Sequence, residues 1–165
     1  MHSIMSIDQS LSCSGITIWE DNQMVHSVCV KTPAKIEAIV RIRSIIADIA
    51  TLVNTYNVKH IVIESLPYGS VSSSVRALAA LYHCIQNYCL DNNVGFSEAH
   101  VTKVKKNFTG KGNAGKGDML KVLETNYPRY YEVFSNQGYK KTTGLADLTD
   151  SFAIYQLYKQ DKETT

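Results

Sequence analysis

The spacing of hydrophobic residues changes along the chain in a way that predicts strands first and helices later. The early segments are short, apolar or alternating, and separated by turns, which is typical of an antiparallel meander. Later segments carry isoleucine, leucine and valine at helical spacing. The predicted strands cover residues 2–7, 15–20, 24–30, 58–63 and 94–97. The predicted helices cover residues 33–54, 72–90, 101–108, 118–126 and 145–158, with an irregular segment at 127–143.

The order of these elements predicts a fold class. Three meandering strands followed by alternating helices and strands indicate an α/β protein with a five-stranded mixed sheet and helices on both faces. The full order, β-β-β-α-β-α-β-α, is that of ribonuclease H-like folds. A chain of 165 residues is long enough to bury one core, so we expect a single domain over residues 1–165.

Two of the predicted strands end at a carboxylate. Asp8 follows the strand at 2–7, and Glu64 follows the strand at 58–63. Acidic residues are poor strand formers, so a carboxylate at such a place is either a turn residue or a functional one. If the two strands are neighbours in the sheet, both side chains emerge at about the same height.

A second acidic pair begins the last predicted helix. Asp147 and Asp150 are three residues apart and therefore share a helix face. Ile154 and Leu157 lie on the same face, which must be buried, so the aspartates occupy its N-terminal end. The alternative is that the pair only caps the helix, with Asp147 as the N-cap and Asp150 in the first turn.

Composition narrows the function classes. The chain is 44% hydrophobic and 19% charged, as soluble globular proteins are, and no window is apolar enough to span a membrane. The first residues include Asp8 and do not resemble a signal peptide. The four cysteines form no C-x-x-C pair and are expected to be reduced and mostly buried. We therefore expect a cytoplasmic protein with no membrane partner.

Positive charge is concentrated in one segment, although the net charge is only +2. Residues 101–121 have a local balance of +5, because six lysines stand against Asp118 alone. Such a stripe on a mildly acidic body suits a phosphate backbone, the alternative being a solvated lysine face. These lysines are Lys103, Lys105, Lys106, Lys111, Lys116 and Lys121.

The same segment contains a glycine-rich stretch that imitates a nucleotide-binding loop. Gly110 to Lys116 reads G-K-G-N-A-G-K, but Gly117 replaces the Ser or Thr that holds Mg²⁺ in a P-loop. The preceding residues 101–108 carry three lysines and do not suit the buried strand that a P-loop requires. We therefore expect no nucleotide cofactor, and instead a turn that brings lysines to a DNA backbone, namely Lys105, Lys111 and Lys116.

Four converging carboxylates beside a basic segment predict metal-dependent nuclease chemistry. Clustered acids do not all stay ionised without a counter-charge, which hard divalent cations supply. Two such ions activate a water molecule and stabilise the leaving oxygen in phosphodiester cleavage. We expect two Mg²⁺ ions, with Mn²⁺ as a substitute, at Asp8, Glu64, Asp147 and Asp150.

Four short motifs, in order along the chain, resemble those of the RuvC-like Holliday-junction resolvases. They are Ile7-Asp8-Gln9-Ser10 with Ser14-Gly15, Val62-Ile63-Glu64, the lysines from 103 to 106 with the glycine-rich stretch, and Ala146 to Asp150 with Ala153. The resemblance implies a homodimeric, Mg²⁺-dependent endonuclease that nicks two strands of a four-way DNA junction symmetrically. It also implies that the acidic set is catalytic and that Lys105 and Lys116 lie near the DNA and the active site.

Two places depart from the family pattern. Gln9-Ser10 stands where the family usually has Pro-Gly or Pro-Ser after the first Asp. Pro67 and then Tyr68 stand where the family often has a Phe that engages bases at the crossover. Tyr68 is therefore a candidate for stacking on a base, and Arg76 completes the expected DNA-binding set.

Symmetric cutting requires a two-fold dimer. The helix at 72–90 is the candidate interface, because its apolar residues surround more of the helix than one face of a sheet can bury. The alternative is that the helix is buried between the sheet and another helix. Other functions that fit the pattern are a broader flap- or fork-cleaving nuclease, a ribonuclease H and a non-catalytic junction-binding module. An actin-like sugar or acetate kinase also opens with a strand and an Asp, but it needs two such domains.

Overall fold

The structure, a computed structural model, describes residues 3–66 and 72–164. Its strands are β1 (Ser3–Asp8), β2 (Cys13–Glu20), β3 (Gln23–Lys31), β4 (Val58–Glu64) and β5 (Gly95–Ala99). They form one sheet in the order β3-β2-β1-β4-β5. The first three strands are antiparallel, whereas β4 is parallel to both β1 and β5. The central strand is therefore β1, which ends at Asp8.

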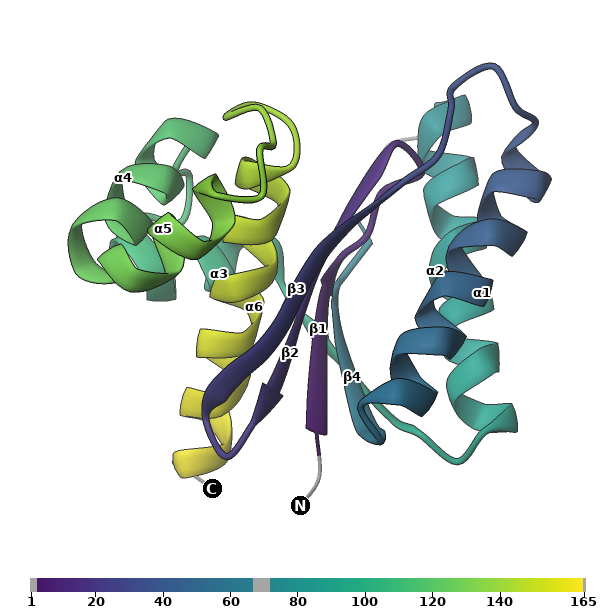
Figure 1. Cartoon of the computed structure of the whole chain (residues 1–165), viewed down its shortest axis with the longest axis horizontal. Helices are drawn as coiled ribbons and strands as arrows, with labels where there is room; N and C mark the ends of the chain where they lie inside the picture. The colour runs from purple at the N-terminus through teal and green to yellow at the C-terminus, as the bar shows by residue number, and fades with distance from the viewer. Residues whose placement is uncertain (1–2, 67–71, 165) are drawn as a thin grey trace.

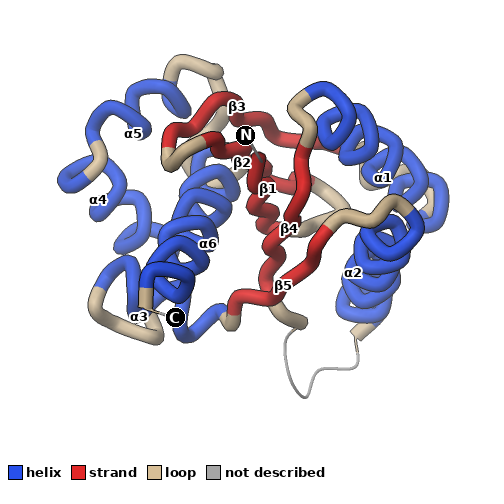
Figure 2. The backbone as a smooth tube through the Cα atoms, turned by 90° about the horizontal axis from the view of Figure 1, so that it is seen from below, coloured by secondary structure: helices blue, strands red, loops and turns tan. Residues whose placement is uncertain are grey.

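Helices cover both faces of this sheet (Figures 1 and 2). On one face lie α1 (Ala38–Thr55) and α2 (Ser73–Asp91). On the other lie α3 (Val101–Thr109), α4 (Lys116–Asn126), α5 (Pro128–Ser135) and α6 (Leu145–Glu163). Helix α6 packs on β1 and β2, and α3, α4 and α5 pack against α6. The predicted five-stranded mixed sheet with helices on both faces is confirmed.

Alternation along the strands decides which face each acid occupies. Ile7 packs in the core beneath α1 and α2, whereas Ile4 packs on the α6 side. Because successive strand residues point to opposite faces, Asp8 belongs to the α6 side. In β4, Val62 packs on the α6 side, which places Glu64 on that side as well.

Small residues on β1 and β2 let α6 lie close to the sheet. A Cβ atom at Gly15 would lie 2.1 Å from the main-chain carbonyl oxygen of Asp147. Beside this contact the buried hydroxyls of Ser6 and Thr17 are 2.6 Å apart, and that of Thr17 is 3.1 Å from Ser151 of α6. The beginning of α6 is therefore held directly over the end of β1.

Helix α1 begins later than the sequence indicates, at Ala38 rather than Pro33. The segment after Pro33 forms a turn, in which the Ile36 N–H donates to the Pro33 carbonyl at 3.2 Å. Ile39 and Val40, which belong to the apolar pattern, are 65% and 51% exposed. The apolar stripe of α1 is wider than the part of the helix that is buried. The buried face consists of Ile42, Ile45, Ile49 and Val53.

The prediction of an irregular segment at 127–143 was wrong for its first half. Helix α5 begins with Pro128, whose fixed φ suits the first helical position. Its tyrosines and valine have low helix propensity, which hides the helix from sequence patterns. Burial of Phe134 beside Phe152, with ring centroids 6.3 Å apart, anchors α5 to α6 instead.

The cysteines are unpaired and mostly buried, as expected. Cys13 and Cys29 lie on neighbouring strands, and the Cys29 thiol donates to the Gly144 carbonyl at 3.3 Å. Burial raises the pKa of Cys13 to about 11 and raises that of Cys29 as well. These thiols are therefore protonated and unreactive at neutral pH. Among the helices of the described residues, none combines the length and apolar character needed to cross a membrane.

Candidate active site at the ends of β1 and β4

Asp8 and Glu64 are the last residues of neighbouring parallel strands. Ile7 of β1 pairs with Ile63 of β4, so each acid follows a paired residue. The two carboxylates emerge at the same height on the same face, as the sequence predicts.

Helix α6 supplies the second acidic pair. The Gly144 N–H donates a hydrogen bond of 2.7 Å to Oδ2 of Asp147, which therefore caps the first turn of the helix. The capping alternative therefore holds only in part, because Asp147 caps from the third helical position behind the N-cap Gly144, and Asp150 lies beyond the first turn. The other carboxylate oxygen of Asp147 lies 3.5 Å from Nζ of Lys116. Capping does not remove Asp147 from the site, because it lines the same cavity as Asp150.

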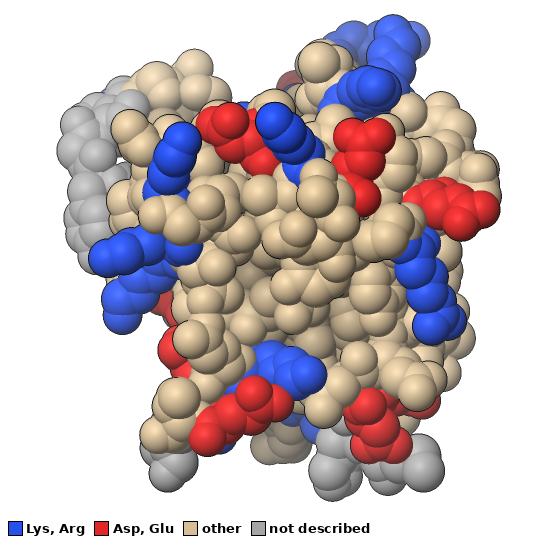
Figure 3. All heavy atoms as spheres, turned by 90° about the vertical axis from the view of Figure 1, so that its left-hand side faces the viewer, with Lys and Arg blue, Asp and Glu red and all other residues tan. Residues whose placement is uncertain are grey.

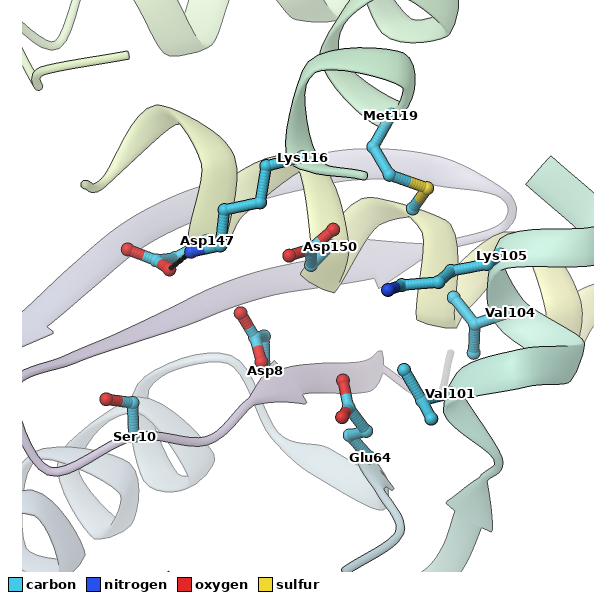
Figure 4. A pocket seen from close by; sticks show the side chains of 10 residues that line it. All are labelled: Asp8, Ser10, Glu64, Val101, Val104, Lys105, Lys116, Met119, Asp147 and Asp150. Atoms are coloured by element: carbon cyan, nitrogen blue, oxygen red, sulfur yellow. Dashed lines mark ion pairs between the residues drawn. The ribbon is translucent and has the colours of Figure 1, made fainter. Parts of the chain in front are cut away.

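The four carboxylates line one open cavity of about 290 Å³. Figure 4 shows Asp8 and Glu64 pointing from the strand ends toward α6, which carries Asp147 and Asp150. Two lysines extend toward the acids, Lys105 from α3 and Lys116 from α4. The remaining walls are formed by Ser10, Val101, Val104 and Met119.

Burial and mutual repulsion raise the pKa values of three of these acids. The pKa of Asp8 lies well above its usual range, first because the surrounding protein desolvates this partly exposed side chain and then because Asp150, Glu64 and Asp147 lie nearby. Burial, followed by the charge of Asp150, raises the pKa of Glu64 to about 7. Burial raises the pKa of Asp150 to about 6, although Lys116 opposes the shift. The site therefore concentrates more negative charge than its two lysines offset.

The glycine-rich loop places the two lysines of the cavity. Helix α3 ends at Gly110, whose φ of 80° is a left-handed conformation that suits glycine. Helix α4 begins after Gly115, whose N–H donates to Asp118 at 3.0 Å. Lys116 is thereby the first residue of α4. A helix and not a strand precedes the loop, which agrees with the rejection of a P-loop.

The other candidates for DNA binding do not line the cavity. Lys103 and Lys106 are exposed on α3, and Lys111 is exposed on the loop after it. Arg76 is exposed on α2, which covers the opposite face of the sheet from α6. Tyr68 lies outside the described residues. On the face that carries α4 and α5, Lys and Arg alternate with Asp and Glu around an uncharged centre (Figure 3). The lysines of residues 101–121 are therefore divided between the cavity and the surrounding surface.

Sequence reasoning missed residues that shape the site without carrying charge. Gln9 is buried and its Nε2 donates a hydrogen bond of 2.6 Å to the main-chain carbonyl of Glu64. Ser10 and Met119 line the cavity. Gly15 permits the approach of Asp147, and its place in the Ser14-Gly15 motif is a signal that identifies it. No comparable signal marks Met119, because its position depends on how α4 packs.

The cavity suits a hard divalent cation in its chemistry. Within the described residues, no three His, Cys, Asp or Glu side chains are arranged to hold a metal ion as they stand. The described lining nevertheless contains four carboxylates and neither a thiol nor an imidazole, a donor set that Mg²⁺ and Mn²⁺ prefer. Burial and neighbouring carboxylates raise the pKa values of Asp8 and Glu64, which disfavours their ionised forms. A bound cation stabilises those ionised forms. Asp8, Glu64, Asp147 and Asp150 are therefore the residues that could hold such an ion.

Comparison with known sequences places most of the chain in one family. Residues 4–125 match the family model described as crossover junction endodeoxyribonuclease RuvC. That range includes Asp8 and Glu64, whereas Asp147 and Asp150 lie beyond it. The crossover junction endodeoxyribonuclease RuvC of Erythrobacter litoralis (strain HTCC2594) is 29% identical over 130 residues, which are 74% of this chain and 80% of the relative.

Solved structures extend the likeness over nearly the whole chain. T. thermophilus RuvC in complex with Holliday junction substrate has a TM-score of 0.75 at 15% identity, covering 99% of this chain and 96% of that one. A Thermus thermophilus RuvC structure has a TM-score of 0.69 at 14% identity, covering 97% and 96%. The yeast mitochondrial Holliday junction resolvase Ydc2 has a TM-score of 0.62 at 14% identity, covering 94% of this chain and 76% of that one. These structures share the fold, and the sequence match over most of the chain shows that this protein belongs to the crossover junction endodeoxyribonuclease RuvC family.

Proposed function

We propose that this protein is a metal-dependent endonuclease that resolves four-way DNA junctions by paired symmetric nicks. The observation that carries the proposal is one cavity lined by four carboxylates from β1, β4 and α6 together with two lysines. The acids suit divalent cations and the lysines suit phosphate, and phosphodiester hydrolysis requires both. Membership of the RuvC family supports the reaction. The fold shared with a RuvC solved on a Holliday junction substrate supports the choice of DNA.

The proposed metal ligands are Asp8, Glu64, Asp147 and Asp150, and the proposed metal is a pair of Mg²⁺ ions, for which Mn²⁺ can substitute. When bound, such ions supply activation of a water molecule and stabilisation of the leaving oxygen. Hydrogen bonding to Gly144 and the charge of Lys116 hold the Asp147 carboxylate in one orientation.

The two lysines of the cavity have two roles in this proposal. Lys105 and Lys116 lower the pKa of Glu64 against the effect of burial, which favours the ionised form that binds a cation. Their ammonium groups also offer positive charge to the oxygens of the scissile phosphate. Lys116 is therefore proposed as a catalytic residue, and Lys105 as a contact to the DNA.

A wider DNA contact surface is proposed around the cavity. Lys103 and Lys106 are exposed on the same helix as Lys105, and Lys111 is exposed on the loop that follows. These lysines are proposed to neutralise backbone phosphates, which fixes the position of the DNA without reading its sequence. Arg76 and Tyr68 remain proposed DNA contacts from the sequence alone, with Tyr68 as a candidate for stacking on a base.

We further propose that a single nuclease domain acts as a homodimer through the first half of α2. The buried residues of α2 begin at Leu81, so its first two turns are not covered by the sheet. Val75 and Leu78 of these turns are only partly buried. A two-fold pairing of this surface would cover them and bring two cavities to one junction.

Incubation with labelled four-way junction, flap, duplex and RNA–DNA hybrid, with and without Mg²⁺, tests the proposed reaction. Paired symmetric nicks in the junction alone, only with Mg²⁺, are expected. Equal cleavage of flaps and forks would favour a broader debranching nuclease, and preference for the hybrid would favour a ribonuclease H. Tight junction binding with no cleavage under any divalent metal would favour a non-catalytic binding module.

A further inference from the structure

Gln9 joins the two strands that carry Asp8 and Glu64. The residue is only 6% exposed, and its Nε2 donates a hydrogen bond of 2.6 Å to the main-chain carbonyl of Glu64. Pairing between β1 and β4 ends with Ile7 and Ile63. The Gln9 hydrogen bond lies beyond that pair, so it extends the connection between the strands to the level of the carboxylates.

The end of β4 is fixed on its other side as well. The Ser65 N–H donates to the Ala99 carbonyl at 3.0 Å, and the Ser65 hydroxyl lies 3.0 Å from Nδ1 of His100. These contacts connect Glu64 to β5 and to the start of α3. The Gln9 contact connects it to β1, the strand that carries the other acid.

The amide at this position is only partly satisfied by hydrogen bonds. Oε1 of Gln9 is buried and has no hydrogen-bond partner among the described residues. An unpaired amide oxygen in the interior destabilises the folded state, and an apolar side chain of similar volume avoids that cost. Locally unfavourable residues of this kind are typical of functional sites. The function suggested by the contact is control of the distance between the strand ends, since ionised Asp8 and Glu64 repel each other.

We propose that Gln9 is a positioning residue that sets the separation of the Asp8 and Glu64 carboxylates, so that both bind one divalent cation. The proposal rests on the proposed function, because it assumes that these acids are metal ligands. Gln9 acts through the main chain of Glu64 and contacts no reacting atom.

Two substitutions and one matched control isolate this contact. Gln9→Met keeps the approximate volume and removes the donor, and Gln9→Asn keeps the amide but shortens its reach by one methylene. Gln86→Met is the control for loss of a side-chain amide away from the cavity: on α2 it removes a hydrogen bond donated at 3.3 Å to the Tyr82 hydroxyl and a contact of 3.0 Å with Nδ1 of His83. The measurements are Mn²⁺ binding to DNA-free protein by electron paramagnetic resonance, and junction cleavage as a function of Mg²⁺ concentration.

Both Gln9 variants are expected to bind Mn²⁺ at least about tenfold more weakly than the wild type, whereas Gln86→Met binds normally. The Mg²⁺ concentration for half-maximal cleavage should rise in the same two variants, with metal-free junction binding unchanged. Wild-type Mn²⁺ affinity in Gln9→Met overturns the proposal, and so does an equal loss in Gln86→Met. If the wild type cleaves no junction, an intact tenfold difference in Mn²⁺ affinity still supports the role of Gln9, and the failure counts against the proposed reaction alone.

Discussion

Ile7 and Ile63 are partners in the parallel ladder between β1 and β4, and each is followed directly by a carboxylate. The register of the central sheet therefore determines the relative position of Asp8 and Glu64. A slip of one residue would turn one acid to the opposite face, beneath α1 and α2, and leave it away from α6. The geometry of the site thus depends on the packing of the sheet as well as on the acids themselves.

Gly15→Ala should displace the beginning of α6, because the added Cβ would lie 2.1 Å from the Asp147 carbonyl oxygen. Backbone cannot yield as a flexible side chain does, so we expect a loss of about 1–3 kcal/mol in the free energy of unfolding, together with a strong loss of cleavage. Urea denaturation and junction cleavage measure the two effects. Gly117→Ala is the matched control, since nothing lies within 4 Å of a Cβ there, and it should be neutral or slightly stabilising. A Gly15→Ala variant with wild-type stability and activity would show that α6 does not need this close approach.

Lys116→Ala should reduce the single-turnover cleavage rate more than it reduces junction affinity, by on the order of 10²-fold in rate. The ammonium of Lys116 contacts Asp147 and lowers the pKa values of Asp8, Glu64 and Asp150. Its removal should therefore also move the acidic limb of the pH–rate profile to higher pH. Lys121→Ala, an exposed lysine of α4 outside the cavity, is the control and should leave the rate unchanged. Weakened binding with a normal rate would make Lys116 only a phosphate anchor.

Stability in the absence of metal should fall as the pH rises, because of Glu64. Its pKa is raised from 4.5 to about 7 in the folded protein, so between these values the folded state binds more protons than the unfolded state. Glu64 alone therefore lowers the free energy of unfolding by about 3 kcal/mol through this window, and the raised pKa values of Asp8 and Asp150 act in the same direction. Glu64→Gln removes the contribution of Glu64 to this dependence and should be more stable than the wild type at pH 8, but not at pH 4.5. Urea denaturation in EDTA across this range measures the difference, and a difference that does not vary with pH would contradict the burial of an ionisable Glu64.

The dimer proposal predicts that the wild type sediments at twice the 18.4 kDa mass of the chain at micromolar concentration. Leu78→Asp places a charge on the partly buried first half of α2 and should yield monomers that keep the fold. Leu90→Ser changes the opposite end of the same helix, where the side chain is 79% exposed, and should leave the dimer intact. Dissociation by Leu90→Ser alone would move the interface to the other end of α2, and a monomeric wild type would contradict the dimer itself.

Much of this architecture could be predicted from the sequence, because strands and acids carry strong local signals. Asp8 and Glu64 end apolar strands. Asp147 shares a helix face with Ile154 and Leu157, both of which are buried. Packing between distant segments carries no such signal. The contact of Gly15 with α6, the hydrogen bond from Gln9 to β4 and the helix at Pro128–Ser135 all depend on tertiary neighbours. These uncharged contacts around the acids could therefore be identified only from the structure, whereas Lys105 and Lys116 were already expected near the site.

The role of the acidic cavity is tested most directly by one comparison of wild type with Asp8→Asn. Single-turnover cleavage of a labelled four-way junction is measured with saturating protein, with and without Mg²⁺, beside binding of the same junction in EDTA. The wild type is expected to make paired nicks only when Mg²⁺ is present. Asp8→Asn should bind the junction with unchanged affinity and cleave it at least about 10³-fold more slowly, because a central metal ligand is lost. Cleavage by Asp8→Asn at the wild-type rate would contradict the assignment of this cavity as the active site.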